Sequence, residues 1–403
     1  MSLGAQFFAN GFIYATFVAR LSEVRDQAGV STAELGLTLS AGSFVALVAS
    51  FFTGFAVRRA GSQRILVAGG LFYATALVGI GASRSGAVLV ATLVLLAAFD
   101  VFVDVAMNLQ ASIISAQRPR PVMSRLHGIW SVGALAGGVT AAGAAQLGIP
   151  LVAHYCTVAG IAIVALLIIT PGLLRGDKPH PLQHHPAVGS RTRRWALLGA
   201  AAISLAIANA MAETLEIATG EWAGLRVRDD LGADAGVAAA VFAVFTIAMA
   251  CGRLLGDHAV SSFGAARTVR GGLAIAVAGV LLATLPGSIA LALAGVVMIG
   301  LGISVLAPQL ADAAARAPGR PGGGFTALFI GHRAAGLYTP AAIGLLAGTS
   351  ALSVGSAMAL IMIPSAILLA GIIGPVLRLP HDSESRSVRP HKRVARRADR
   401  HPD

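Results

Sequence analysis

The chain has 403 residues, of which 56% are hydrophobic and only 12% are charged. Soluble domains carry about 25% charged residues, so this composition excludes a water-exposed globular fold and predicts an all-α polytopic membrane protein. The formal net charge of +12 does not indicate nucleic-acid binding, because the basic residues collect in short loops and one tail.

Twelve apolar runs follow one another along the chain, each about as long as the 20 residues that cross a bilayer as a helix. Turns containing Pro150 and Pro286 separate two pairs of these runs. The predicted spans fall near residues 3–21, 34–57, 65–82, 86–115, 127–148, 150–172, 195–219, 235–256, 269–286, 288–311, 325–348 and 351–377.

A hydrophilic break divides these spans into six and six, which predicts two pseudo-symmetric bundles related by an axis along the membrane normal. We expect an N-terminal six-helix bundle over 1–172, a cytoplasmic linker over 173–194, a C-terminal bundle over 195–377 and a basic, disordered tail over 378–403. Three glycines recur at an offset of 198, with Gly54, Gly133 and Gly138 matched by Gly252, Gly331 and Gly336.

The basic residues are strongly biased to one side of the predicted topology. If both termini are cytoplasmic, 24 of the 30 Lys and Arg lie on the cytoplasmic side, five lie outside and Arg333 lies within a span. This bias predicts a multi-pass protein of a bacterial plasma (inner) membrane with both ends inside. The sequence lacks a G-x-x-x-x-G-K-[ST] loop, metal-ligand spacing and a G-x-S-x-G motif, so we expect no ATP hydrolysis, cofactor or metal, and no enzyme activity.

A polar stripe runs through the fourth predicted span. Asp100, Asp104 and Asn108 are four residues apart and share one helical face near the middle of the bilayer. A carboxylate at that depth costs roughly 3 kcal/mol, and intramembrane acids mark ion pathways by default. We interpret Asp104 and Asp100 as proton-coupling candidates and Asn108 as a substrate-binding candidate. The alternative is buried carboxyl groups bonded to a neighbouring helix.

A second polar stripe lies in the seventh span, the repeat equivalent of the first. Asn209, Glu213 and Glu216 share one face there, whereas the first span offers Asn10 and Tyr14 without an acid. Glu213 and Glu216 are therefore further proton-coupling candidates, and any proton chemistry should be asymmetric between the halves. Asn10, Tyr14 and Asn209 are substrate-binding candidates.

Several other polar residues within the spans allow two interpretations each. Trp130 fits stacking on a substrate as well as anchoring at the membrane interface. Arg333 can form an ion pair, bind an anionic substrate or extend back to the cytoplasm, and both Trp130 and Arg333 are substrate-binding candidates. Glu221 and Trp222 fit an interfacial anchor as well as a substrate contact. Gly133, Gly137 and Gly138 are interpreted as helix packing, and Pro308 and Pro340 as kinks.

The loops after the second and eighth spans carry a recognisable pattern. They read GFAVRRAGSQR and GRLLGDHAVSSFGAAR, and both resemble the short loop signature of the major facilitator superfamily. The second copy keeps an acid, Asp257, whereas Arg58 stands where that family usually has Asp. The gating-loop candidates implied by this resemblance are Gly54, Arg58, Arg59, Gly61, Arg64, Gly252, Arg253 and Asp257.

Longer segments sharpen the resemblance. ATFVARLSEVRDQAGVSTAELG, DVAMNLQASI and RPVMSRLHGIWSVGALAGG look like the YbjJ-like branch of that superfamily, near the fucose–proton permeases, over roughly residues 5–375. A Gly-Tyr pair common in the eleventh span of that branch is His332-Arg333 here. The resemblance implies twelve transmembrane helices in the major facilitator fold.

The leading hypothesis is a secondary active transporter of a small polar solute, sugar-like or an organic acid, coupled to protons. We expect its partners to be that solute, protons and membrane lipids, without nucleic acid, and we expect a monomer. One alternative is an efflux transporter of drugs or metabolites. An alternative of another class is a membrane receptor or scaffold without transport, which Arg58 in the first signature loop favours.

Overall fold

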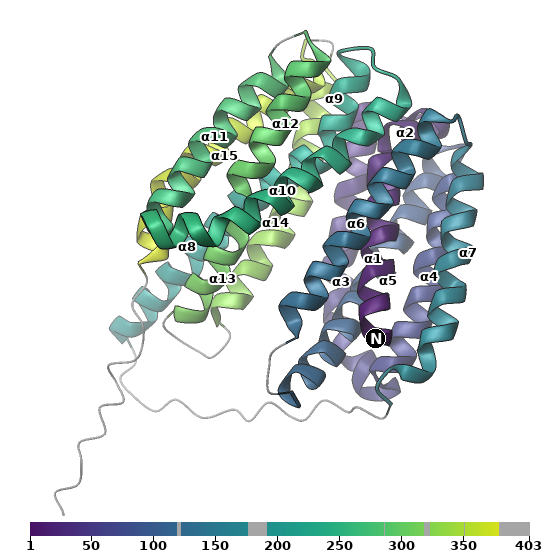
Figure 1. Ribbon diagram of the computed structural model, residues 1–403, viewed down its shortest axis with the longest axis horizontal. Helices are drawn as coiled ribbons and strands as arrows, with labels where there is room; N and C mark the ends of the chain where they lie inside the picture. Colours follow the sequence, from purple (N-terminus) through teal and green to yellow (C-terminus); the bar gives the residue numbers. More distant parts are fainter. Residues whose placement is uncertain (119–121, 176–191, 286, 318–322, 350, 379–403) are drawn as a thin grey trace, which may run out of the picture.

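The computed structural model describes residues 1–118, 122–175, 192–285, 287–317, 323–349 and 351–378. Helices account for nearly all of these residues (Figure 1). The first half contains α1 (Ser2–Ala19), α2 (Leu21–Ala28), α3 (Thr32–Ala60), α4 (Ser62–Ala82), α5 (Gly86–Ala116), α6 (Met123–Gln146), α7 (Leu151–Ile169) and a 3₁₀ turn, η1 (Thr170–Gly172). The second half contains α8 (Thr192–Ile217), a π-helical segment η2 (Ala218–Trp222), α9 (Ala223–Asp229), α10 (Ala235–Phe263), α11 (Ala265–Thr284), α12 (Ile289–Ile303), α13 (Leu306–Arg316), α14 (Gly323–Ala347) and α15 (Val354–Leu377).

The structure confirms an all-α membrane fold with twelve long helical segments. Ten segments in the described part of the chain are long and apolar enough to cross a bilayer, with α8, η2 and α9 joined as one and α12 and α13 as another. The remaining two, α1 and α14, contain polar residues such as Asn10 and Arg333, which lower their mean hydropathy. The predicted linker and tail lie mostly outside the described residues, and α8 already begins at Thr192.

Local signals repeat between the halves at an offset of 203. Ser31 caps α3 in a capping box, and Asp234, 203 residues later, accepts a hydrogen bond from Val237 N at the start of α10. The turns that end these helices also match, because Gly61 and Gly264 have positive φ angles of 85° and 80°. These turns connect consecutive antiparallel helices in both halves.

This register corrects the loop comparison made from the sequence. With Gly61 aligned to Gly264, Asp257 occupies the position of Gly54, and the position of Arg58 is taken by Ser261. The offset of 198 from Gly54 to Gly252 is therefore a coincidence of a glycine-rich chain.

The offset of 198 does hold where α1 packs on α6 and α8 on α14. A Cβ on Gly133 would meet Phe8 O at 2.1 Å, and one on Gly331 would meet Ala206 O at 2.3 Å. Both glycines therefore allow close helix approach, which agrees with the interpretation of Gly133 as a packing residue.

Prolines lie at helix starts and inside helices. Pro150 is the N-cap of α7, and Pro340 lies inside α14. The tenth span is broken at Ser304 and Val305 into α12 and α13, just before Pro308, where the sequence predicts a kink. Pro308 is in the first turn of α13 and has no N–H to bond back to Ser304, so it favours a new helix start there. Pro286 lies outside the described residues.

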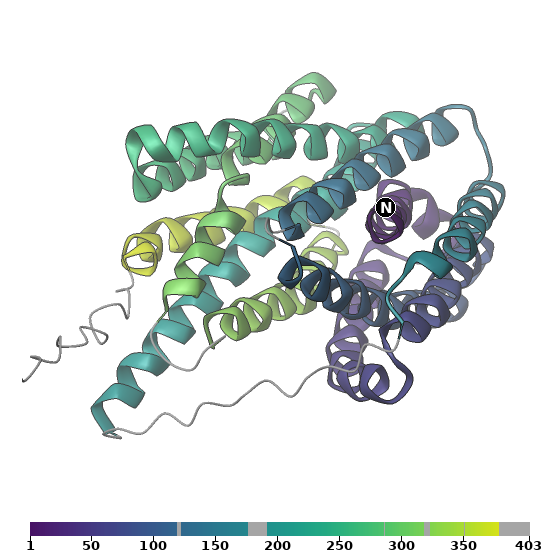
Figure 2. The same cartoon turned by 60° about the horizontal axis from the view of Figure 1, so that its bottom comes forward.

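The two bundles converge at one end and diverge toward the other. In Figure 1 they meet at the top, where α2 and α9 lie, and separate toward the bottom, which Figure 2 turns toward the reader. Contacts between the bundles run through α3 with α14 and α6 with α10. We call the end with α2 and α9 the closed end, and the end that contains Met1 the open end.

Close helix packing holds the closed end together. A Cβ on Gly36 of α3 would meet Pro340 O of α14 at 2.3 Å, and Gly344 would be obstructed by Gly36 at 2.8 Å. A Cβ on Gly236 of α10 would likewise meet Gln146 Oε1 at the end of α6, at 2.1 Å. α3 and α14 thus approach one another backbone to backbone, and α10 leaves room at Gly236 for the side chain of Gln146.

Candidate functional site

A chain of side-chain hydrogen bonds joins three helices of the first bundle. Trp130 Nε1 on α6 donates to Asn10 Oδ1 at 2.8 Å, and Asn10 Nδ2 on α1 donates to Asp100 Oδ1 on α5 at 2.9 Å. Asn10 is 5% exposed, whereas Asp100 and Trp130 are partly buried. Three residues predicted separately from the sequence therefore form one connected group around a carboxylate.

The second acid of the α5 stripe has a different environment. Asn108 Nδ2 donates to Asp104 Oδ1 at 2.8 Å and to Asp104 O at 3.0 Å, one turn along the same helix. Both residues are partly buried. The carboxylate of Asp104 is thus oriented from within α5, whereas that of Asp100 is held by α1.

The α8 stripe is tied to α14 in the second bundle. Glu213 Oε2 lies 2.9 Å from His332 Nδ1, and Asn209 Nδ2 donates to Leu328 O at 2.8 Å. The His332 side chain is 48% exposed although it lies within a predicted span, so one face of α14 is accessible near this pair. The hydrogen bond of Asn209 is to the helix backbone, which is a structural contact. Glu216 is partly buried one turn from Glu213.

Arg333 stands between the acids of the two bundles. Its guanidinium interacts electrostatically with Asp104, Asp100 and Glu213. Its Cζ lies 5.1 Å from the ring centroid of Phe329, in cation–π geometry. Its buried Nε has no hydrogen-bond partner among the described residues. Of the roles considered from the sequence, the arrangement fits a cation that offsets buried carboxylates.

Aromatic rings connect the bundles on the closed side of these charges. The ring of Tyr14 on α1 lies 5.9 Å from that of Trp130 and 6.3 Å from that of Phe242 on α10, measured between centroids. Two polar residues that the sequence reading missed lie nearby in the second bundle. The Tyr338 hydroxyl hydrogen-bonds the Thr214 hydroxyl, linking α14 to α8. Tyr338 follows His332 by six residues and gave no stripe pattern.

Most residues of the two signature loops lie apart from this group, whereas Arg253 interacts electrostatically with Glu216. Arg58, Arg59 and Arg64 at the α3–α4 turn are exposed, as are Arg253 and Asp257 on α10. In the described part of the chain none of these five residues has an ion pair. Gly252 packs against Ser304 of α12, and Gly54 and Gly61 are only partly buried.

Ion pairs cross between the bundles at the closed end, which the sequence reading did not predict. Arg25 of α2 forms a two-pronged pair with Asp229 of α9, with Nη2 to Oδ1 at 2.8 Å and a second bond from Nη1 to Oδ2. Arg228 of α9 bonds Asp26 of α2 at 2.9 Å. The pKa of Arg25 is raised by its hydrogen bond to Asp229 and further by Asp26, which outweighs the opposing effect of burial.

A repeated tripeptide explains the reciprocity of these pairs. Val-Arg-Asp occurs at 24–26 and again at 227–229, the same offset of 203. Each half therefore presents the same Arg and Asp to the other, as expected for two-fold pseudo-symmetry. This repeat was the available sequence signal for the closed-end ion pairs.

Each short helix is also anchored to its own bundle by a buried arginine. Arg20 is 1% exposed and bonds Glu23 at 2.6 Å and Ile149 O at 2.8 Å. Arg226 is 5% exposed and bonds Asp230 at 3.1 Å and Thr284 O at 3.1 Å. Arginines assigned to the outer loops from the sequence are therefore largely buried in ion pairs.

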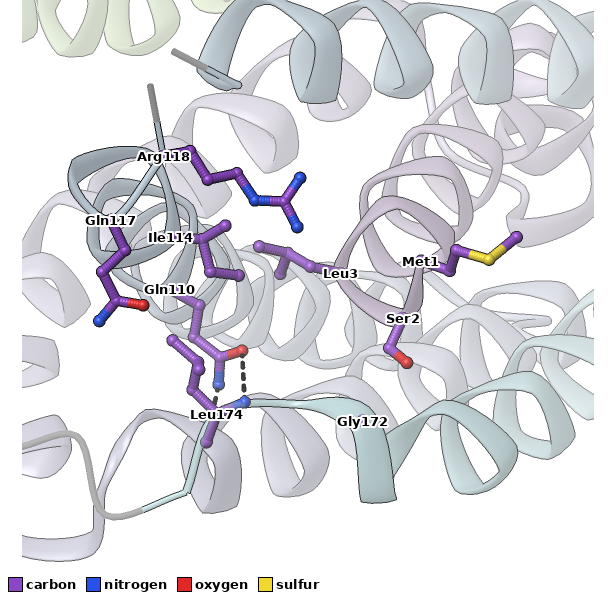
Figure 3. Close-up of a pocket in the computed structure, with 9 residues that line it drawn as sticks. All are labelled: Met1, Ser2, Leu3, Gln110, Ile114, Gln117, Arg118, Gly172 and Leu174. Carbon is purple, nitrogen blue, oxygen red and sulfur yellow. Dashed lines mark hydrogen bonds between the residues drawn. The ribbon is translucent and has the colours of Figure 1, made fainter. Parts of the chain in front are cut away.

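A separate pocket lies in the first bundle at the open end (Figure 3). It has a volume of about 350 Å³, and its lining includes Met1, Arg118 and Gln110. Gln110 is fully buried and bonds Ser62 Oγ at 2.9 Å as well as both backbone groups of Leu174. None of the predicted site residues lines this pocket.

The comparisons with known proteins agree with this architecture. The family model of the Major Facilitator Superfamily matches residues 3–340. The chain belongs to that superfamily. Because members of this superfamily are transporters and not enzymes, the chain is a membrane transport protein rather than a catalyst.

Relatives from bacteria match along most of the chain. An uncharacterized MFS-type transporter of Yersinia pestis is 29% identical over 354 residues, covering 86% of this chain and 88% of the relative. An uncharacterized transporter of Sinorhizobium fredii is 27% identical, covering 93% and 97%. The membrane protein MosC of Rhizobium meliloti is 27% identical, covering 77% and 74%.

Solved structures match in fold. The nucleoside transporter NupG has a TM-score of 0.71 at 11% identity, covering 94% of this chain and 98% of that one. A bacterial homologue of the human lysosomal transporter Spinster, in an inward-facing and occupied conformation, has a TM-score of 0.67 at 16% identity, with 93% and 94% covered.

Proposed function

We propose that the protein is a secondary active transporter of a small polar solute, sugar-like or an organic acid, that is coupled to protons and works by alternating access. The observation that carries the proposal is the group of ionisable side chains contributed by both bundles. Asp100 and Asp104 come from the first, and Glu213, His332 and Arg333 from the second. Charges placed between two repeats near the middle of a span are typical of transporter sites.

The bias of basic residues supports a bacterial inner membrane location with both termini cytoplasmic. In that orientation the open end faces the cytoplasm. The Spinster homologue is in an inward-facing conformation, and its similarity in fold agrees with this direction. The transport cycle would then require the closed end to open and the open end to close.

The acids in this group differ in how they could serve coupling. Among the described residues, the hydrogen bonds of the Asp104 side chain stay within its own helix, so it can exchange a proton without breaking a hydrogen bond to another helix. Protonation of Asp100 would alter its hydrogen bond from Asn10 and, through it, Trp130. We assign Asp104 to proton exchange and the Asp100, Asn10 and Trp130 group to solute contact. Glu213 and His332 form a second site where a proton can be exchanged.

The test is solute-dependent proton movement in proteoliposomes, measured with an internal pH dye against sugars, polyols and organic acids. Asp104→Asn should abolish proton movement, and Glu216→Gln should reduce it. Asp312→Asn is the matched control, because Asp312 is an exposed acid on α13 outside the group. Solute-dependent proton movement that is unchanged in both Asp104→Asn and Glu216→Gln would contradict a role of these acids in proton coupling.

The branch of the superfamily and two alternative functions also belong to the proposal. The motifs that resemble the YbjJ-like branch support a position near the sugar–proton permeases. Efflux of a metabolite or drug would give outward rather than inward solute movement in the same vesicles. A receptor without transport would bind solute and move neither solute nor protons.

A further inference from the structure

Glu221 lies in the π-helical segment η2, between α8 and α9. π segments are rare and concentrate at functional sites. Equivalent residues of the two halves show that the second half is longer in this region. The offset between the halves is 198 at Phe8 and Ala206, but 203 at Arg25 and Arg228. The second half therefore has five additional residues within the interval 206–228, which contains η2.

The carboxyl group of Glu221 is at the interface between the bundles. It lines a cavity of about 10 Å³ formed by the α1–α2 junction of the first bundle and by η2, α9 and α10 of the second. A space of this size holds about one water molecule. Residues from both sides include Val18, Leu21 and Ser22 on one and Gly224 and Phe242 on the other.

Among the described residues, no charge is paired with this carboxyl group. Glu221 as a whole is partly buried, but its Oε2 is buried and has no hydrogen-bond partner in the described residues, and the carboxyl forms no ion pair there. An ionised carboxylate enclosed among apolar residues is strongly disfavoured, whereas the neutral acid loses much less on burial. Closing the bundles over Glu221 therefore favours the protonated acid.

Titratable residues occur on most of the helices that pack on η2. From α1, the phenol of Tyr14 interacts electrostatically with Glu221. No charged residue occurs in α15. The charged residues of the other helices packed on η2 are Arg193, Arg194, Glu213 and Glu216 on α8, Arg226, Arg228 and Asp229 on α9, Arg253, Asp257 and His258 on α10, and His332 and Arg333 on α14.

We propose that Glu221 is a protonation site of the closed end and must be neutral for the two bundles to close there. When the bundles separate at this end, the carboxyl meets water and can release its proton. The site thus takes a proton from the closed-end side of the membrane, separately from the acids of α5 and α8. This rests on the proposed function only in requiring that the closed end opens during transport.

The direction of the pH dependence follows from the thermodynamic linkage between proton binding at Glu221 and closure of the bundles. The closed state binds one more proton at Glu221 than the state in which this end is open. Raising the pH therefore shifts the population toward opening, by at most about tenfold per pH unit for a single proton. Arg25 does not supply this response, because its raised pKa keeps it charged throughout.

The experiment measures the distance between spin labels at the closed ends of the two bundles. Arg84→Cys and Gly287→Cys place labels at positions 203 residues apart, in a Cys156→Ser/Cys251→Ser background, in proteoliposomes titrated from about pH 5 to pH 9. We expect one short distance at low pH and a growing longer-distance population as the pH rises. Glu221→Gln should keep the short distance at every pH.

Controls separate the possible outcomes. Asp234→Asn, which changes an exposed acid that caps α10 at the same end, should retain the wild-type pH response. Glu221→Asp, a second variant that keeps an acid, should respond to pH with a shifted midpoint. A pH response that survives Glu221→Gln overturns the proposal and leaves the proposed transport function intact. A closed end that opens at no pH and with no solute overturns both.

Discussion

The closed end and the open end of the two bundles are built from different side chains. At the closed end, glycines bring α3 against α14 and α6 against α10, and reciprocal arginine–aspartate pairs join α2 to α9. At the open end, the signature loops present exposed arginines, and the described residues there form no ion pair. Five of the six ion pairs in the described part of the chain lie at the closed end.

This contrast indicates which contacts favour one state of the transport cycle over another. Contacts that exist only while an end is closed shift the population by their full free energy, whereas contacts within a bundle are present in both states. The arginines Arg20 and Arg226 belong to the second class, since each bonds within its own half. The glycine contacts and the closed-end ion pairs belong to the first.

The largest expected effect comes from enlarging a glycine at the closed end. Gly36→Leu would force a side chain against Pro340 O, where even a Cβ would be 2.3 Å away. Overpacking costs about 1–3 kcal/mol, which shifts the bundles toward opening by roughly 5- to 150-fold. The spin-label distance between Arg84→Cys and Gly287→Cys measures this shift. Gly143→Ala on α6, where a Cβ meets nothing within 4 Å, should leave the distance unchanged.

A moderate effect is expected from the closed-end ion pairs. Asp229→Asn removes the negative charge and one of the two acceptor oxygens of a two-pronged bond whose partner Arg25 is 12% exposed. Partly exposed ion pairs contribute about 1 kcal/mol, so the closed population should fall roughly fivefold. The swapped pair Asp26→Arg/Arg228→Asp should recover much of the loss seen with Asp26→Arg alone. Equal distances in the single and double variants would show that the pairs do not hold the bundles together.

A smaller effect on the same distance is expected at the open end. Arg58→Ala alters an exposed residue without an ion pair among the described residues. The free-energy difference between the open and closed populations of the closed end should therefore change by less than about 0.5 kcal/mol. The effect of Arg58→Ala on transport rate reports the opposite half of the cycle, in which the open end must close. A large change in the closed-end distance would mean that the two ends are not independent.

The smallest effect is expected from the two cysteines. Cys156 and Cys251 are exposed and unpaired in the described structure, so replacing both with Ser should change stability by less than about 0.5 kcal/mol. Thermal unfolding in detergent measures this. A loss of stability larger than that would indicate helix packing at these positions that exposure does not reveal.

Much of the candidate site was predictable, and the reason is chemical. Polar residues inside apolar spans are conspicuous, so Asp100, Asp104, Glu213 and Arg333 stood out before any helix was placed. Their partners were not predictable, because periodicity within one helix says nothing about which helix packs beside it. The pairing of Glu213 with His332 is therefore a result of the tertiary structure.

The sequence by itself determined the helices and their twofold repetition. Long apolar runs must form helices in lipid because no other partner satisfies the backbone, and capping residues and glycines set where those helices begin and turn. Only the tertiary structure decided which end of the bundles is closed. The choice depends on helix approach at Gly36, on the reciprocal use of Val-Arg-Asp and on the enclosure of Glu221, all of which join residues about 200 or more positions apart.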